Sequence, residues 1–246
     1  GKKYEMRYRS LTFYTGRYEM KWTPGGDFRH VAVPEDAEIG TFGPQLLVTL
    51  RSPWLGYEAG AMVAAPLEPF MAATSDADRA PLLAELFAPS ESCSLEGTAE
   101  TKNYLVLSVL EDVVTSFRFW KLSDGQFQLA RTFEGEMGVA PSVSGVDAAD
   151  SDAIWLTSEG YARPTTLAIA DAGDPDAAEP LKALPSFFDA SGLATQQLYA
   201  ASADGTRVPY FLVAPKDLPL DGSTPALLYG YGGFEVSLTP GYSGGV

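Results

Sequence analysis

Short apolar or alternating runs recur along the first 185 residues of the chain. Residues 45–50 (QLLVTL), 104–110 (YLVLSVL) and 153–158 (AIWLTS) start 59 and then 49 residues apart. With allowance for inserted loops, this spacing is typical of β-propeller blades, whose repeats are about 40–50 residues long. Two further strand-like runs follow each of them, namely residues 60–67, 116–122 and 165–171, and then residues 82–87, 126–131 and 179–184. The pattern predicts three blades of antiparallel strands.

An incomplete unit precedes these three, with strand-like runs at residues 7–14, 17–22 and 28–33. Clusters such as Ser123-Asp124-Gly125 separate the runs and are typical of tight turns between antiparallel strands. Helical pattern is rare: residues 74–85 have it, and Pro81 cuts the stretch short. We therefore expect residues 1–185 to form three blades and a part blade, the C-terminal blades of a propeller.

The repeated pattern of strand-like runs ends near residue 186, where we place a domain boundary. Residues 194–201 and 208–214 are strand-like and flank Asp204-Gly205, a strong hairpin signal. Residues 226–229 (ALLY) are predicted to form a buried apolar strand. The expected fold class is thus mostly β, with a partial propeller followed by a second domain over residues 186–246.

A glycine-rich stretch, Gly230-Tyr231-Gly232-Gly233-Phe234, follows the predicted strand at once. Glycines after a buried strand permit a tight turn with positive φ and bring backbone N–H groups close to a ligand. In α/β-hydrolases a glycine-rich loop after the third strand contributes a donor to the oxyanion hole. A tyrosine hydroxyl in such a loop could fill that role. The alternative is a glycine-rich turn with two packed aromatic side chains.

Composition narrows the classes of function. Seventeen basic and 32 acidic residues give a net charge of −15, which argues against nucleic acid or an anionic membrane surface as the main partner. No apolar run approaches the roughly 18 residues that a membrane-spanning helix needs. Cys93 is the only cysteine and is expected to be a buried structural thiol. His30 is the only histidine, so we expect no metal site and no cofactor.

The C-terminal quarter of the chain resembles the prolyl oligopeptidase (prolyl endopeptidase) family of serine peptidases. The stretches that carry the resemblance are FFDASGL (187–193), SADGTRVPYFLVAPKDLPLDGS (202–223) and PALLYGYGGFEVSLTPGYS (225–243). The blades upstream are also similar to the propeller of that family, most clearly DAIWLTSEGYARPTTLAIAD (152–171). The resemblance covers essentially the whole chain, and it implies that the second domain is the start of an α/β-hydrolase peptidase domain.

The resemblance also implies roles for residues of the YGYGGF motif. Tyr231 would offer its hydroxyl to the oxyanion, and Phe234 would help to line the pocket that accepts proline. Tyr229 is expected to be a packing residue. The implied reaction is acyl transfer by a Ser-Asp-His triad, with short proline-containing peptides as substrates and a propeller that restricts their entry to the active site.

One motif is a false signal for the nucleophile. Gly241-Tyr242-Ser243-Gly244-Gly245 fits the G-x-S-x-G expression, but a nucleophile elbow follows a buried strand and opens a helix. Here Thr239-Pro240 precedes it, and neither Asp nor His follows Ser243 in the remaining residues. His30 lies far upstream, whereas the triad histidine comes last in hydrolase order. We therefore expect the triad to lie outside this sequence.

The sequence thus reads as an internal fragment of a serine endopeptidase or oligopeptidase, and the 246-residue chain alone is expected to be inactive. A relative with a preference for basic or acylated substrates is an alternative. So is a non-catalytic propeller that binds peptides or proteins. The fragment is also expected to self-associate, or to need the remainder of its protein, because cut blades expose strand edges. We expect a soluble cytoplasmic or periplasmic protein; the compartment stays open.

Overall fold

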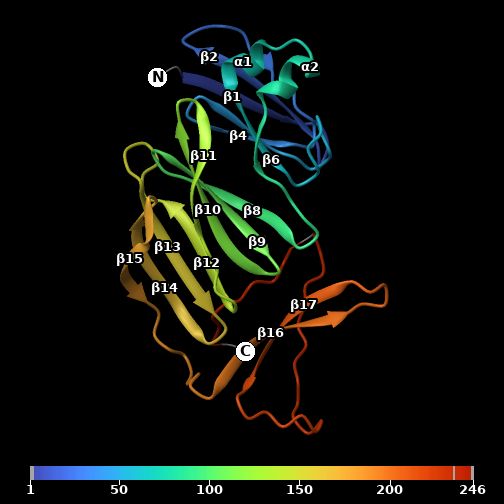
Figure 1. Cartoon of the computed structure of the whole chain (residues 1–246), viewed down its shortest axis with the longest axis vertical. Helices are drawn as coiled ribbons and strands as arrows, with labels where there is room; N and C mark the ends of the chain where they lie inside the picture. The colour runs from blue at the N-terminus through green and yellow to red at the C-terminus, as the bar shows by residue number, and fades with distance from the viewer. Residues whose placement is uncertain (1–2, 235, 245–246) are drawn as a thin grey trace. The chain divides into compact units, whose positions relative to one another are not determined.

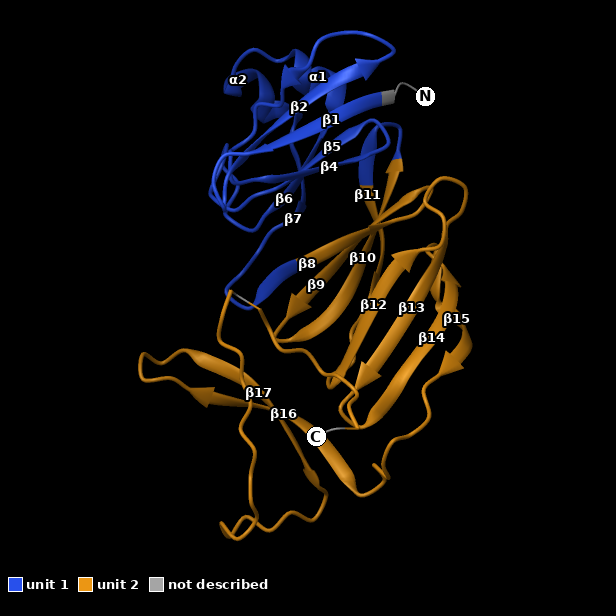
Figure 2. Ribbon diagram, turned by 180° about the vertical axis from the view of Figure 1, so that it is seen from behind, with its two compact units in different colours: residues 1–95, 123–127 blue, residues 96–122, 128–246 orange. Residues whose placement is uncertain are grey.

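The computed structural model describes residues 3–234 and 236–244 (Figure 1). Antiparallel strands dominate it, and the chain divides into two compact units. The first comprises Gly1–Leu95 and Ser123–Phe127, and the second comprises Glu96–Leu122 and Gln128–Val246 (Figure 2).

The first unit begins with a three-stranded sheet in the order β1-β2-β3. Its strands are β1 (Lys3–Ser10), β2 (Gly16–Thr23) and β3 (Arg29–His30). Met20 of β2 is buried and belongs to the core of this unit, and Tyr18 and Trp22 pack against that core. Because side chains alternate between the two faces of a strand, this spacing of two residues places all three on one face. The sheet is the part blade that the sequence predicts.

A four-stranded meander completes the core of the first unit, in the order β4-β5-β6-β7. Its strands are β4 (Glu38–Phe42), β5 (Gln45–Thr49), β6 (Met62–Pro66) and β7 (Ala84–Phe87). The first four residues of both central strands are buried, as expected for strands covered on both faces.

The connection from β6 to β7 is helical but irregular. It contains α1 (Leu67–Ala72), α2 (Asp76–Arg79) and the 3₁₀ turn η1 (Ala80–Leu82). The helical stretch expected from residue 74 is cut short near Pro81, as predicted. Ser75 begins α2 with a reciprocal cap to Asp78, and Pro81 lies in the 3₁₀ turn, so that an extended strand begins by residue 84.

Two further four-stranded meanders follow, in the orders β11-β10-β9-β8 and β12-β13-β14-β15. The strands are β8 (Cys93–Glu100), β9 (Tyr104–Glu111), β10 (Val114–Ser123), β11 (Gln126–Phe133), β12 (Val139–Gly145), β13 (Ala153–Gly160), β14 (Arg163–Asp171) and β15 (Asp174–Ala183). Their shared core contains Val106, Phe117, Phe119 and Ile154, all at most 1% exposed. The mostly β fold with repeated antiparallel blades is confirmed.

Each four-stranded blade contains one strand that the sequence pattern does not reveal. These are β4, β8 and β12, the first strand of each blade. They are short or rich in small and polar residues, as in CSLEGTAE and VAPSVSG. In β12 even Pro141 is accommodated, because β12 lies at the edge of its sheet.

The hairpin predicted around Asp204-Gly205 is present as β16 (Leu193–Ala201) and β17 (Arg207–Pro215). Gly205 has a φ of +89°, which suits the tight turn. The expected strand over residues 226–229 is wrong. Residues 224–230 form no strand or helix, and Leu228 is 95% exposed. A strand exists through its ladder of hydrogen bonds, and no neighbouring strand among the described residues pairs with this apolar run. The boundary near residue 186 stays a prediction.

Candidate functional site

The glycine-rich stretch forms a turn on an extended segment after β17. Gly232 and Phe234 have φ angles of +66° and +55°, in the left-handed region. The N–H of Val236 donates to the carbonyl oxygen of Gly233 at 3.2 Å, which closes the turn. The left-handed conformation costs glycine little, whereas Phe234 adopts it against its steric preference.

Tyr231 lies across the backbone of this turn. A Cβ atom added to Gly233 would meet the Tyr231 ring at 3.4 Å and its hydroxyl oxygen at 3.8 Å. The phenol ring therefore lies beside the main chain at residue 233, at a distance that would leave a Cβ atom there in ordinary van der Waals contact. The Tyr231 side chain is 54% exposed, so its hydroxyl can reach a ligand.

Phe234 and Tyr229 are more exposed still, at 82% and 78%. The described residues thus place Tyr231, Gly233 and Phe234 together on one turn, as the motif requires. They do not form a closed pocket around Phe234, and Tyr229 does not pack as the sequence predicts.

Residues beyond the turn are held much more firmly. Pro240 is buried, and the ring of Tyr242 stacks against both Phe187 and Phe188, with ring centroids 5.2 and 5.4 Å apart. The Tyr242 hydroxyl accepts a hydrogen bond from the N–H of Phe187 at 2.8 Å. Sequence reasoning missed this contact, because 55 residues separate the partners and only the tertiary fold brings them together.

The false nucleophile motif has none of the geometry of an elbow. Residues 236–244 form neither strand nor helix, and Tyr242, next to Ser243, is engaged in the aromatic stack. Gly245 lies outside the described residues.

The other singled-out residues lie in ordinary structural settings. His30 is exposed on β3, with Nδ1 3.3 Å from the carbonyl oxygen of Tyr18. Cys93 is buried, as predicted. Within residues 3–234 and 236–244, no three His, Cys, Asp or Glu side chains gather where a metal ion could bind. No helix in that part of the chain is long and apolar enough to cross a membrane.

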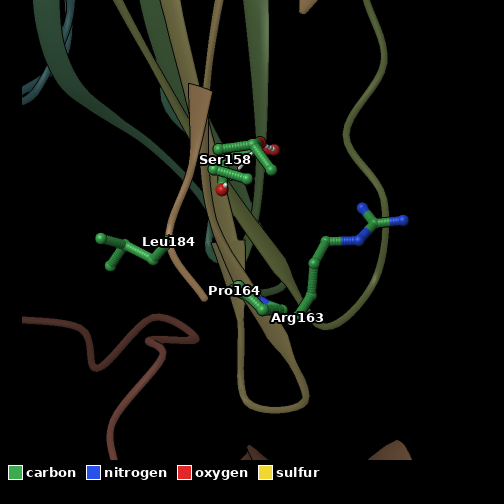
Figure 3. Close-up of a pocket in the computed structure, with 6 residues that line it drawn as sticks. Ser158, Arg163, Pro164 and Leu184 are labelled. Atoms are coloured by element: carbon green, nitrogen blue, oxygen red, sulfur yellow. Dashed lines mark hydrogen bonds between the residues drawn. The ribbon is translucent and has the colours of Figure 1, made fainter. Parts of the chain in front are cut away.

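An open depression of about 430 Å³ lies over β13, β14 and the end of β15 (Figure 3). Its hydroxyl groups are paired with each other, since Ser158 Oγ lies 2.9 Å from Thr166 Oγ1. Arg163 forms an ion pair with Glu136 at 3.0 Å, and in Figure 3 its side chain extends away from Leu184. The depression therefore contains no unpaired reactive group and is not a catalytic candidate.

Comparison with known proteins shows which class of proteins this chain resembles. An uncharacterized peptidase of Sinorhizobium fredii is 39% identical over 249 residues, which cover 96% of this chain and 33% of that protein. Prolyl oligopeptidase A of Galerina marginata is 34% identical over 121 residues, covering 47% of this chain and 16% of that protein. The solved structure of a post-proline cleaving enzyme from Rickettsia typhi aligns with a TM-score of 0.81 at 25% identity, over 97% of this chain and 35% of that one. No protein-family model matches the chain.

The chain is thus similar, over nearly its whole length, to peptidases that carry a β-propeller. Within that class, the chain is a homologue of the prolyl oligopeptidase family. It spans about a third of the length of the first relatives that it matches.

Proposed function

We propose that this chain is part of a serine-type peptidase that cleaves short, proline-containing peptides by acyl transfer. The blades would restrict access to the active site, and a Ser-Asp-His triad outside these 246 residues would carry out the covalent chemistry. The observation that supports the proposal best is the glycine-rich turn, on which Tyr231 is held close to the main chain with its side chain half exposed.

Tyr231 would act as a donor in the oxyanion hole. Attack on the scissile carbonyl places negative charge on its oxygen, and a phenol O–H aimed at that oxygen stabilises the tetrahedral intermediate more than the substrate. Phe234, exposed on the same turn, would form one wall of the pocket for the proline ring once the rest of the domain surrounds it.

The Tyr231→Phe substitution in the full-length protein tests this role. Loss of one oxyanion donor lowers kcat by roughly 10²–10³-fold with little change in KM, because the bond forms mainly in the transition state. Steady-state kinetics on a proline-containing chromogenic amide would measure the effect. Tyr229→Phe is the matched control and is expected to keep wild-type kcat. Equal kcat values for both variants would contradict the role of Tyr231 in the oxyanion hole.

A second assay separates the proposed function from its alternatives. The 246-residue chain is incubated with a serine-directed covalent probe and a proline amide, beside the full-length protein. We expect labelling and turnover only in the full-length protein. Labelling of Ser243 in the short chain would show that Ser243 is the nucleophile and would contradict the proposal. A full-length protein that prefers substrates with a basic residue would be a related oligopeptidase of different specificity, and one that binds peptides without turnover would be a non-catalytic propeller.

A further inference from the structure

A short segment, residues 187–192, contacts both ends of the long excursion that carries the glycine-rich turn. At the first end, the N–H of Lys216 donates to the carbonyl oxygen of Gly192 at 2.9 Å. The Lys216 ammonium group donates to the carbonyl oxygen of Ser191 at 2.8 Å. The chain therefore leaves β17 fixed to this segment by a backbone bond and a side-chain bond.

The second end returns to the same segment 26 residues later. Tyr242 stacks on Phe187 and Phe188 at interplanar angles of 20° and 26°, and its hydroxyl accepts from the N–H of Phe187. A Cβ atom on Gly244 would meet the Phe187 side chain at 3.0 Å, so the main chain there lies directly against that ring. This end is fixed by ring packing together with a hydrogen bond.

The residues between the two ends are far more exposed to solvent. Leu220 and Leu228 are 92% and 95% exposed. Pro240, at the returning end, is buried. The excursion thus has two fixed ends on one short segment and an exposed middle. Fixing the ends of a loop restricts the conformations open to all the residues between them.

We propose that residues 187–192 form a clasp that closes residues 217–241 into a loop, with Lys216 and Tyr242 as positioning residues for the glycine-rich turn. The catalytic consequence rests on the proposed role of Tyr231, since a clasp that limits the loop also limits where that phenol can lie. Small errors in the placement of a catalytic group are costly, with about 1 Å being worth roughly 100-fold in rate.

Amide hydrogen exchange of the 246-residue chain tests the clasp without any need for activity. Tyr242→Phe keeps both ring contacts and removes only the acceptor oxygen, so the Phe187 amide is expected to exchange about two- to tenfold faster. Tyr242→Leu also removes the ring contacts and is expected to increase exchange by more than about tenfold. Leu220→Ala, on the exposed part of the loop, is the matched control and leaves exchange at Phe187 unchanged.

Wild-type exchange at Phe187 in both Tyr242 variants would overturn the clasp. Lys216→Met examines the other end separately: proteolysis within residues 217–238 should become faster while exchange at Phe187 stays near that of wild type. Proteolysis at the wild-type rate in Lys216→Met and Tyr242→Leu alike would show that the ends do not restrain the loop, and would also overturn the proposal.

The positioning role is tested by kinetics in the full-length protein. Tyr242→Leu is expected to lower kcat about tenfold or more, whereas Tyr242→Phe, which keeps the stack, recovers most of the rate. If Tyr231→Phe lowers kcat but Tyr242→Leu does not, the oxyanion role stands and the positioning role is wrong. If Tyr242→Leu speeds exchange at the Phe187 amide while Tyr231→Phe leaves kcat unchanged, the clasp is supported and the proposed function of Tyr231 is wrong.

Discussion

At the scale of single residues, the most consequential side chain outside the candidate site is Asp152. Asp152 forms an acidic pair in sequence with Asp150. Its Oδ1 accepts hydrogen bonds from Thr101 Oγ1 and from the N–H of Asn103, both at 2.8 Å, and Oδ2 accepts from the Asn103 amide at 2.6 Å. One carboxylate thus fixes the turn between β8 and β9 to the start of β13.

The pKa of the Asp152 carboxyl follows from these contacts. Burial alone would raise it, but the hydrogen bonds from Asn103 and Thr101 outweigh burial and hold the pKa below its ordinary value of 3.8. The unfolded chain therefore takes up this proton first as the pH falls. The stabilisation is complete above the ordinary value and is lost as the pH falls through the folded-state pKa.

The Asp152→Asn substitution should lower the free energy of unfolding by about 1–2 kcal/mol at neutral pH, because the new amide group opposes the Asn103 amide donor. Urea denaturation measures the difference. The gap between wild type and variant should narrow as the pH falls below 3.8. Asp150→Asn, on the exposed neighbour, is the control and should show no gap. A gap that is constant with pH would contradict the carboxylate as its source.

At the scale of elements, the packing of neighbouring blades in the second unit depends on Ile154. This side chain is fully buried in the cluster that joins the sheet of β9 and β10 to the sheet of β13 and β14. Ile154→Ala should lower the free energy of unfolding by about 2–5 kcal/mol, through lost apolar burial and the cavity that remains. Leu129→Ala, at a 49% exposed position of β11, should cost under about 1 kcal/mol. Similar losses in both variants would contradict this view of the core.

The sequence predicts elements well where burial imposes a period of two, as along β10, whose burial alternates from Val114 to Trp120. It fails at β4, β8 and β12, where small and polar residues pair through backbone bonds that leave no apolar pattern. At residues 226–229 the sequence predicts a strand that the structure does not contain, because this apolar run has no partner strand among the described residues. The motif locates Tyr231 and Phe234, whereas the clasp around Tyr242 depends on contacts across 55 residues that local pattern does not encode.

At the scale of the whole molecule, net charge and exposed apolar surface have opposite effects on self-association. The net charge of −15 favours repulsion between copies, while Leu227, Leu228 and Phe234 are each at least 79% exposed on one segment. We expect self-association that strengthens as salt screens the charges. Light scattering should show that Leu228→Asp reduces it, whereas Ser237→Asp, with the same change in charge, reduces it much less. Equal effects would assign the behaviour to charge alone.

The clasp also has a consequence for the order in which the chain folds. The strands of each blade pair with neighbours in sequence, so every blade can form from short-range contacts, which is the fast route. The contact between Phe187 and Tyr242 instead joins residues 55 apart in sequence. Even with the β16–β17 hairpin formed, it must still close residues 217–241 into a loop, at an entropic cost that grows with the logarithm of loop length. The blades and the β16–β17 hairpin are therefore expected to be complete before the glycine-rich turn is fixed, so that the candidate site is the last part of the described chain to be ordered.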